Sequence, residues 1–528
     1  MKGKVEYSYD RKRYEWNGKY EDRDEPKTAG FWWDSLNRVW YAPTVYVADK
    51  LLGKKRDEEK ANKSYAVNCE YYPIAPQGLS YRDYQRAGIE FLVTHHNCLL
   101  ADDPGSGKTI QVAGLLNSVA WNHAFILCPA SLVLNWKREL EKWLVVPKRI
   151  YAHVKPNTKA AAKTIADLFC YDVVIMGYEA AVSFFKKNDN DYPSFDIVVA
   201  DESHYLKTEK AQRTKTALSL LDRAIDRRVL MTGTPILNRP IELWTTIRLL
   251  DPKGWKGKRQ FFSKYFCEGH KEYIRVRGGM TREIWVEDGA CHIEELNAYL
   301  RDNFMIRRRK ADILPFLPPK IKQNIEVLVS CSDVTKERKQ YERMVKMYGE
   351  ERALDMLLGD ADGAAMTEMA EIRHNIALAK APKVVEFVRT LLDEDANRKV
   401  IIFAHHRDVV NVLKEAFGEN AVFIVGGMSA EDKQKAVDDF QNKKEIRVFI
   451  GNMHAAGVGL TLTAADTVVF AELDFTPGVM EQCEDRAHRI GQDHEAVRVF
   501  RIVIEGSLDE YLLDILDRKE DIYERVTK

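Results

Sequence analysis

The sequence predicts an α/β protein: two parallel-sheet domains flank a helical insertion and follow a small strand-rich module. Short apolar runs alternate with helical patterns from about residue 70 to 250, and the alternation resumes at residue 399. Near-continuous apolar strands between helices are typical of parallel sheets covered on both faces. The stretch from about 255 to 380 has a mostly helical and polar pattern, with a hairpin-like patch near residues 273–276.

The apolar runs give the expected strands, and shifts in composition give the domain boundaries. Strands are expected at residues 124–128, 172–176, 196–200, 399–403, 421–425, 447–450 and 467–470. The predicted domains are residues 1–66, a small module; 67–250, a first α/β lobe; 251–380, helical protrusions and a linker; 381–515, a second α/β lobe; and 516–528, a terminal helix end.

The first 66 residues are aromatic and basic. A β-hairpin is expected over residues 31–41 with its turn near 34–37, and a helix is expected over Val45–Leu52. This composition suits stacking on unpaired bases. The alternative is that the aromatic rings form the core of a tiny domain. Both roles are compatible if opposite faces of the strands serve them.

Bulk composition limits the kinds of partner. The 528 residues carry 80 Lys and Arg against 80 Asp and Glu, so any nucleic-acid site must be a local patch. No apolar run approaches the ~20 residues of a membrane span, and the N-terminus has no apolar signal core. The eight scattered cysteines, without a C-x-x-C pair, favour a reducing compartment over a zinc module or a disulfide framework.

A glycine-rich loop at residues 102–109 is the strongest functional signal. It lies between an apolar run and a helix start, so its N–H groups and the helix dipole can hold an anion. Gly105 and Gly107 allow close backbone approach, Lys108 supplies a cation for phosphates, and Thr109 a hydroxyl for Mg²⁺. Asp102 stands where the common phosphate-loop pattern has glycine. The alternative is a plain turn before a helix.

Two further motifs follow expected strands. Asp201 is placed to hold Mg²⁺ and Glu202 to deprotonate an attacking water, since ligands bind at the carboxyl ends of parallel strands. Thr232 and Thr234, with His204, are candidates for relaying the state of these carboxylates. The alternatives are a solvated turn or a helix cap for the first motif and a plain strand-to-turn junction for the second.

Arg486 and Arg489 form a fourth candidate motif. Being three residues apart, they are expected to share one face of a helix. Two guanidinium groups suit the charge that develops on a transferring γ-phosphate. The alternative is a surface helix whose arginines pair with Glu484 and Asp485.

Together these motifs resemble those of superfamily 2 helicases, specifically the Swi/Snf-type double-stranded DNA translocases, over about residues 75–515. Four more segments carry the resemblance: residues 81–88 (the adenine-reading Q motif), 129–136 (motif Ia), 304–320 (the interlobe linker) and 457–462 (motif V). Residues 403–406, 469–473 and 477–478 favour the annealing-helicase, HARP-type branch. The glycine-rich loop, motif I of the family, has Asp-Asp-Pro-Gly-Ser where the family usually has Asp-Glu-Met-Gly-Leu. Residues 201–204, motif II, have Ser203 where alanine is common. Both motifs keep the working side chains.

The resemblance implies two RecA-like lobes that bind ATP and Mg²⁺ in a cleft. The implied catalytic residues are Lys108, Glu202, Arg486 and Arg489. The implied ATP-binding residues are Gln85, Asp103, Gly105, Ser106, Gly107, Lys108, Thr109, Gly457 and Gly459. Thr109 and Asp201 would hold Mg²⁺, Thr232, Thr234 and His204 would couple, and Ser131 and Thr461 would face the DNA backbone.

The predicted function is a DNA-dependent ATPase that moves on double-stranded or forked DNA without reading sequence. It would act in the cytoplasm at a bacterial or viral nucleoid, or in a eukaryotic nucleus. The alternatives are an RNA helicase, the motor subunit of a restriction or polymerase-recycling system, and a DNA-binding scaffold with a dead ATPase. The module at residues 1–66 weakly resembles DNA-structure-recognition modules. The basic run at residues 307–310 is either a linker element or an import or DNA-binding patch.

Overall fold

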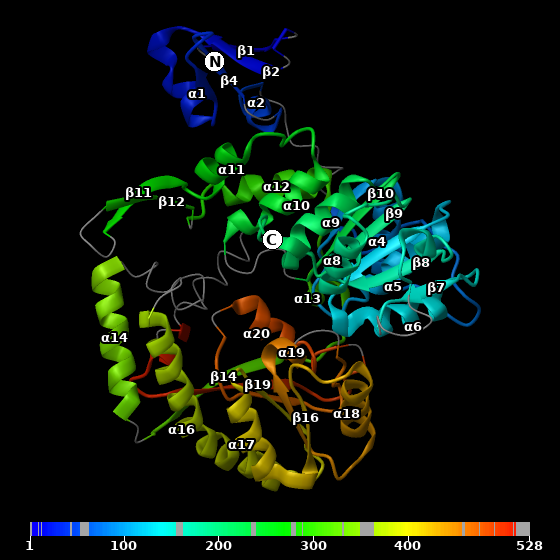
Figure 1. Ribbon diagram of the computed structural model, residues 1–528, viewed down its shortest axis with the longest axis vertical. Helices are drawn as coiled ribbons and strands as arrows, with labels where there is room; N and C mark the ends of the chain where they lie inside the picture. The colour runs from blue at the N-terminus through cyan, green and yellow to red at the C-terminus, as the bar shows by residue number, and fades with distance from the viewer. Residues whose placement is uncertain are drawn as a thin grey trace. The chain divides into compact units, whose positions relative to one another are not determined.

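The computed structural model describes residues 3–8, 10–11, 13–42, 45–52, 63–154, 162–233, 239–275, 281–287, 289–329, 332–348, 364–456, 460–474, 476–489, 491–510 and 512–513. These residues form two compact units that divide between Arg309 and Lys310, with Pro104–Ser106 grouped with the second unit. Figure 1 labels many of the elements of both.

The first unit is built on a seven-stranded sheet in which every pairing is parallel. The order is β13-β5-β10-β9-β6-β8-β7. The strands are β5 (Asn97–Leu100), β6 (Ala124–Cys128), β7 (Ile150–Ala152), β8 (Val173–Gly177), β9 (Ile197–Asp201), β10 (Arg227–Met231) and β13 (Met305–Ile306). Strands β6, β8 and β9 are buried at every residue, as expected for a sheet covered on both faces.

Helices cover this sheet through apolar residues at helical spacing. In α6, the buried Val133, Trp136, Leu140 and Trp143 recur every three or four residues, so they line one face. The helices of the unit are α4 (Asp83–Thr94), α5 (Lys108–Ser118), α6 (Val133–Trp143), α7 (Ile165–Leu168), α8 (Tyr178–Lys187), α9 (Gln212–Asp222), α10 (Trp244–Leu250), α11 (Arg259–Phe266) and α12 (Ile293–Asn303).

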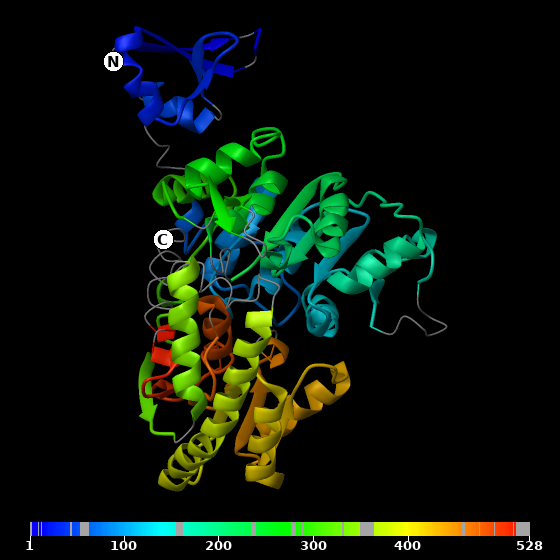
Figure 2. The ribbon, with the colours of Figure 1, turned by 60° about the vertical axis from the view of Figure 1, so that its left-hand side comes forward.

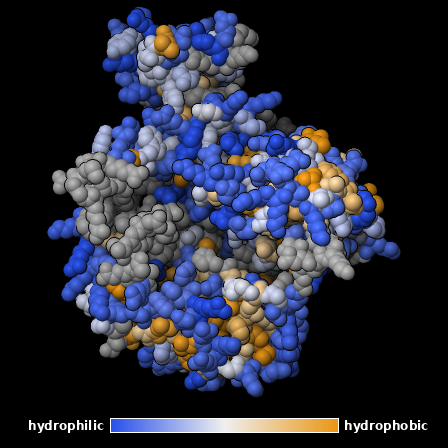
Figure 3. All heavy atoms as spheres, in the orientation of Figure 1, coloured by the Kyte–Doolittle hydropathy of each residue, from blue (hydrophilic) through white to orange (hydrophobic). Residues whose placement is uncertain are grey.

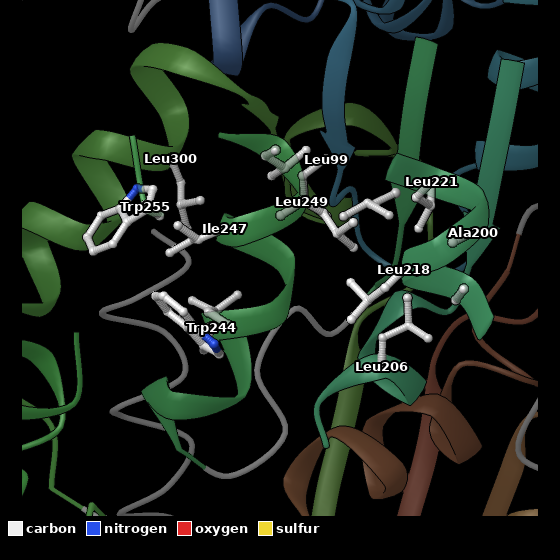
Figure 4. Packing of buried hydrophobic residues seen from close by; sticks show 14 of the residues in the cluster. Leu99, Ala200, Leu206, Leu218, Leu221, Trp244, Ile247, Leu249, Trp255 and Leu300 are labelled. Carbon is white, nitrogen blue, oxygen red and sulfur yellow. The ribbon is translucent and has the colours of Figure 1, made fainter. Parts of the chain in front are cut away.

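One hydrophobic cluster connects the sheet with the helices that follow it. Leu218 and Leu221 of α9 lie near Ala200 of β9, and Trp244, Ile247 and Leu249 of α10 extend the cluster to Trp255 and Leu300 (Figure 4). The helical region after residue 250 also carries an antiparallel hairpin, β11 (His270–Arg275) and β12 (Thr281–Val286), which confirms the hairpin-like patch. Val276 of that patch lies outside the described residues.

The N-terminal module is a four-stranded antiparallel sheet in the order β1-β2-β4-β3. Its elements are β1 (Gly3–Ser8), β2 (Arg13–Gly18), α1 (Asp24–Thr28), β3 (Trp32–Asp34), β4 (Val39–Tyr41) and α2 (Val45–Leu52). The predicted hairpin and the helix that follows it are confirmed. At the turn, the Asp34 carboxylate accepts the backbone N–H groups of Leu36 and Asn37 at 3.0 and 3.1 Å.

The second unit holds a six-stranded sheet, again with only parallel pairings, in the order β14-β19-β18-β15-β17-β16. Its strands are β14 (Lys320–Val327), β15 (Val400–Ala404), β16 (Ala421–Ile424), β17 (Val448–Asn452), β18 (Thr467–Phe470) and β19 (Val497–Ile504). Its helices are α13 (Lys310–Ile313), α14 (Ser332–Tyr348), α16 (Ala364–Glu394), α17 (Arg407–Phe417), α18 (Ala430–Asn442), α19 (Met453–Ala456) and α20 (Pro477–Glu484).

Helices α14 and α16 lie alongside one another, as both ribbon views show (Figures 1 and 2). The strands predicted from apolar runs match β6, β8, β9, β15, β16, β17 and β18 to within two residues. The predicted α/β fold with two parallel sheets is therefore confirmed. In the face shown in Figure 3, hydrophilic residues predominate and hydrophobic ones are scattered. Among the described residues, no helix combines the length and hydropathy needed to span a bilayer.

Candidate nucleotide site

The glycine-rich loop connects β5 to α5, as the sequence predicts. Gly105 and Gly107 have φ of 82° and 76°, in the left-handed region that favours glycine. A Cβ on Gly107 would lie 2.6 Å from Nε2 of Gln85, so this glycine also lets α4 approach the loop. The Ser106 side chain is buried. Helix α5 begins at Lys108, which places its N-terminal N–H groups and Thr109 at the end of the loop.

Lys108 bends back over the loop. Its Nζ donates to the carbonyl oxygens of Asp102 and Asp103 at 2.7 and 3.2 Å. Burial lowers the pKa of this amine, and the carboxylates of Glu202, Asp102 and Asp201 oppose the shift. The ammonium is therefore held at the loop by carbonyl groups that an anionic ligand can replace.

Asp201 lies at the end of β9 and is buried. Its Oδ2 accepts a hydrogen bond from Nε1 of Trp136 at 2.8 Å, and its Oδ1 accepts the backbone N–H of Glu202 at 2.9 Å. Burial, with the adjacent Glu202 charge, raises the pKa of Asp201 to about 7. Trp136 is the last residue of the predicted motif Ia, but its contact with Asp201 was not predicted, because no local pattern shows that its indole would reach a residue 65 positions later.

Glu202, His204 and Thr232 form one cluster. Nδ1 of His204 lies 3.1 Å from Oγ1 of Thr232 and 3.3 Å from Oε2 of Glu202, and the Thr232 hydroxyl donates to Glu202 Oε2 at 3.5 Å. Glu202 has φ of 50°, a backbone conformation that is strained for a residue with a Cβ. Such strained residues are often found at functional sites. The structure therefore brings together three residues predicted for catalysis and coupling.

The arginine motif lies in the second unit, and its predicted helical setting is wrong. Helix α20 ends at Glu484, so Arg486 and Arg489 lie in the turns that follow it. Arg486 is buried, and its guanidinium donates to the carbonyls of Gln482 and Leu460 at 2.8 and 3.2 Å. Arg489 donates from Nε to Asp485 O at 2.9 Å and from Nη1 to Thr461 Oγ1 at 3.3 Å.

The acidic neighbours of these arginines do not form a surface helix. Glu484 and Asp485 are fully buried. Lys320 lies 3.1 Å from Glu484 and 2.9 Å from Asp485, and Lys310 lies 2.8 Å from Asp485. Although burial opposes it, these cations hold the pKa of both carboxyl groups below the usual range. The alternative of a solvated, salt-bridged helix is therefore wrong.

The other predicted residues are more scattered. Gln85 is buried and its Oε1 accepts the N–H of Arg82 at 3.0 Å, where it caps α4. Asp103 pairs with Arg307 at 3.1 Å. Ser131 is half-buried in the turn after β6 and Thr461 is exposed in the second unit. Thr234, Gly457 and Gly459 lie outside the described residues.

The residues present fit a nucleotide and a divalent cation. The left-handed glycines leave backbone N–H groups accessible for phosphate. Asp201 is a buried carboxyl group whose raised pKa shows that the protein alone compensates its charge poorly. A cation such as Mg²⁺, which binds carboxylates, hydroxyls and phosphate oxygens, would supply that compensation.

The sequence is similar to that of known proteins. Residues 36–384 match the SNF2-related domain and residues 383–491 the helicase conserved C-terminal domain. The chain is 33% identical over 83% of its length to the human "DNA annealing helicase and endonuclease ZRANB3", of which it covers 40%. It is 32% identical over 84% of its length to a Caenorhabditis elegans protein, of which it covers 61%. That protein is the "SWI/SNF-related matrix-associated actin-dependent regulator of chromatin subfamily A-like protein 1 homolog".

The chain thus spans about two to three fifths of these relatives. Among solved structures, it is similar to the Sulfolobus solfataricus SWI2/SNF2 ATPase core in complex with dsDNA. That similarity has 21% identity and a TM-score of 0.39, over 87% of this chain and 94% of the other. The predicted resemblance is confirmed, and the chain belongs to the SNF2-related family.

Proposed function

We propose that this chain is an ATP-dependent DNA translocase, which couples ATP hydrolysis to movement on double-stranded or forked DNA. Its membership of the SNF2-related family supports this function. The observation that carries it is the arrangement at the end of β9, where a buried, poorly compensated Asp201 adjoins a backbone-strained Glu202. The phosphate-type loop follows β5 of the same sheet, and β10 lies between β5 and β9.

In this proposal the chain's own residues bind and orient the nucleotide and activate the attacking water. The loop N–H groups and Lys108 bind the phosphates, while Thr109 and Asp201 would hold Mg²⁺, which neutralises phosphate charge when bound. Glu202 accepts the proton of the attacking water. Thr232 and His204 contact Glu202 and would pass its state to the end of β10. Arg486 and Arg489 would stabilise charge on the transferred γ-phosphate.

DNA contacts are proposed at Ser131 in the first unit and Thr461 in the second. The hydroxyl of each residue would donate to backbone phosphates, so binding would tolerate any sequence and weaken with salt. The cytoplasm around a nucleoid, or a nucleus in a eukaryote, is the compartment that such a partner requires.

The N-terminal module is a candidate reader of DNA structure. Register places Tyr7, Tyr14, Trp16, Trp40 and Trp33 on one face of its sheet, because directly paired residues share a face. Trp16 is buried, whereas Tyr7 and Trp33 are 41% and 47% exposed. This face therefore carries a buried ring and exposed rings, while Trp32 on the opposite face packs on Phe261. The exposed edges of this aromatic row would stack on unpaired bases.

The test is ATPase stimulation by single-stranded, duplex and forked DNA and by RNA. We expect stimulation by duplex or forked DNA, and loss of hydrolysis by at least about 100-fold in Lys108→Ala. Lys186→Ala, an exposed lysine at the end of α8, is the matched control. Stimulation by RNA alone would indicate an RNA helicase, and unchanged activity of Lys108→Ala would contradict the proposed site.

The module is tested on the same substrates. Trp33→Ala is expected to lower the preference for forked DNA over duplex DNA several-fold. The control is Tyr20→Ala, which removes an exposed ring that lies outside the strands. An unchanged fork preference in Trp33→Ala would contradict the recognition role.

A further inference from the structure

The segment that leaves the first unit is buried in a way that nucleotide binding alone does not explain. Strand β13 pairs in parallel with β5, the strand that leads into the glycine-rich loop. The next residues, Arg307 and Arg308, are 4% and 2% exposed. Lys310, the first residue of the second unit, is 7% exposed. Three buried cations in four residues require buried anionic partners.

Arg308 finds its partner in Asp102, the residue that replaces the first glycine of the loop pattern. Its Nε donates to Asp102 Oδ1 at 2.9 Å, its backbone N–H donates to the same oxygen at 3.0 Å, and its Nη2 contacts Oδ2. Gln111 of α5 donates to Asp102 Oδ2 at 3.1 Å and accepts from Arg308 Nη2 at 3.0 Å. A Cβ on Gly88 would lie 1.7 Å from Gln111 Oε1, so α4 closes the cluster without a side chain there.

Arg307 holds the adjacent part of the loop. Its Nη2 lies 3.1 Å from Asp103 Oδ1, and its Nη1 donates to the carbonyl of Ala101 at 2.6 Å. The two carboxylates anchored in this way belong to the residues whose carbonyl oxygens accept from Lys108. The position of the Lys108 ammonium therefore depends on a backbone that the two arginines fix.

Lys310 holds the arginine-bearing turn of the second unit. Its Nζ lies 2.8 Å from Asp485 Oδ1 and donates to the carbonyl of His488 at 2.9 Å. These two residues immediately precede Arg486 and Arg489 in the sequence. Burial lowers the pKa of Lys310 to about 8, against the opposing charge of Asp485, so the amine is charged at neutral pH. The turn that carries both arginines is thus fixed by a residue of the linker.

We propose that residues 307–310 form a strap that positions one functional element in each unit. Arg308 positions the phosphate loop through Asp102, and Lys310 positions the arginine turn through Asp485. Only Arg309, which is exposed, separates the two anchors. Both are positioning residues, since neither is placed on the reacting atoms. The proposal rests on the proposed ATPase function for its kinetic consequences, but not for its structural ones.

The Lys310 anchor is tested with Lys310→Met. We expect kcat for DNA-stimulated hydrolysis to fall by about tenfold or more, while the affinity for a fluorescent ATP analogue changes less than threefold. Hydrogen exchange at residues 485–489 is expected to rise selectively, without nucleotide or DNA. The matched control is Lys380→Met, which removes another buried lysine of the second unit, paired with Asp509 at 2.8 Å.

The Arg308 anchor is tested with Arg308→Met, and with Arg308→Lys as the milder variant should the first not fold. We expect nucleotide affinity to fall by about tenfold in Arg308→Met, with faster hydrogen exchange at residues 102–109. Arg227→Met is the control. Arg227 is also buried, but it is the first residue of β10, at the end of the sheet opposite the glycine-rich loop. Partial rescue in Arg308→Lys would separate positioning from a simple loss of charge.

The outcomes distinguish the strap from the proposed function. A wild-type chain that hydrolyses no ATP would refute the function, and the exchange measurement would still test the anchors. Selective exchange at the two sites supports the strap. Exchange that rises throughout a unit, and equally in the Lys380→Met and Arg227→Met controls, would overturn it. So would normal kcat and nucleotide affinity in Lys310→Met and Arg308→Met.

Discussion

Two pairs of adjacent carboxylates, one in each unit, show how differently buried acidic residues are used. Asp201 is the last residue of a central strand of the first sheet and Glu202 follows it, while Glu484 is the last residue of α20 and Asp485 follows it. The second pair is enclosed by Lys310, Lys320, Lys322 and Arg501, so its charge is compensated by the chain itself. The first pair has Lys108 as its main cation, and the pKa of Asp201 rises to about 7.

The difference separates a structural acidic pair from a reactive one. Chain cations hold the second pair permanently ionised, and that fixes the turn that follows. The negative charge of the first pair is only partly compensated by the chain, and a metal cation bound with a nucleotide would compensate the rest. A high carboxyl pKa beside a loop suited to phosphate therefore indicates chemistry, whereas a low one inside a lysine cluster indicates architecture.

The largest expected effect comes from neutralising the first pair. Asp201→Asn is expected to lower Mg²⁺-dependent ATP hydrolysis by at least about 100-fold, because the proposed metal ligand is lost. Its free energy of unfolding at pH 8 is expected to be unchanged or higher, since a costly buried charge is removed. Steady-state hydrolysis and urea denaturation measure the two. A large loss of stability would contradict the comparison.

The second pair is expected to respond in the opposite sense. Glu484→Gln removes a buried carboxylate that pairs with the half-buried Lys320 at 3.1 Å, and it is expected to cost about 1.5–3 kcal/mol of unfolding free energy. Glu337→Gln is the control, since this buried glutamate has a raised pKa, caused mainly by burial, and accepts a hydrogen bond from Leu508 N at 3.0 Å. Urea denaturation of both variants makes the measurement. An equal loss of unfolding free energy in the two variants would contradict a special structural role of the second carboxylate pair.

The two carboxylate pairs are also expected to change stability with pH in opposite directions. The pKa of Asp201 is raised, so the folded state binds its proton more tightly than the unfolded state between about pH 4 and 7. Its contribution to stability is therefore lost as pH rises through that window. One pKa unit corresponds to about 1.4 kcal/mol. Asp485, with a lowered pKa, contributes stability that is lost on acidification below about pH 4.

Urea denaturation at several pH values between 5 and 8 measures the Asp201 contribution. The difference in unfolding free energy between wild type and Asp201→Asn is expected to grow as the pH rises to about 7 and then to level off. A difference that does not vary with pH would show that Asp201 is ionised throughout this range, like Asp485.

The smallest effect concerns the orientation of Asp201. Trp136→Phe removes the indole donor at 2.8 Å while keeping an aromatic ring, and a loss of hydrolysis of about five- to tenfold is expected. Trp143→Phe in the same helix is the control, because that ring packs on Tyr81 and not on Asp201. Equal losses in kcat for the two variants would show that Trp136 acts only through packing.

Local pattern predicted much of this molecule. Apolar runs located strands such as β6 and β18 to the residue, and turn chemistry located the β3–β4 hairpin. The three-residue spacing of Arg486 and Arg489 predicted a shared helix face wrongly, because α20 ends at Glu484 and both arginines follow it. The Asp102–Arg308 and Trp136–Asp201 contacts join residues 206 and 65 positions apart, so no local signal shows them.

The most direct test of the account is ATP hydrolysis by wild type and Glu202→Gln, with and without duplex DNA, alongside nucleotide binding. Hydrolysis by wild type is expected to rise severalfold or more with DNA. Glu202→Gln is expected to bind nucleotide normally and to hydrolyse it at least about 100-fold more slowly, because the general base is lost. DNA-stimulated hydrolysis that persists in Glu202→Gln would contradict the assignment of the first carboxylate pair as the reactive one.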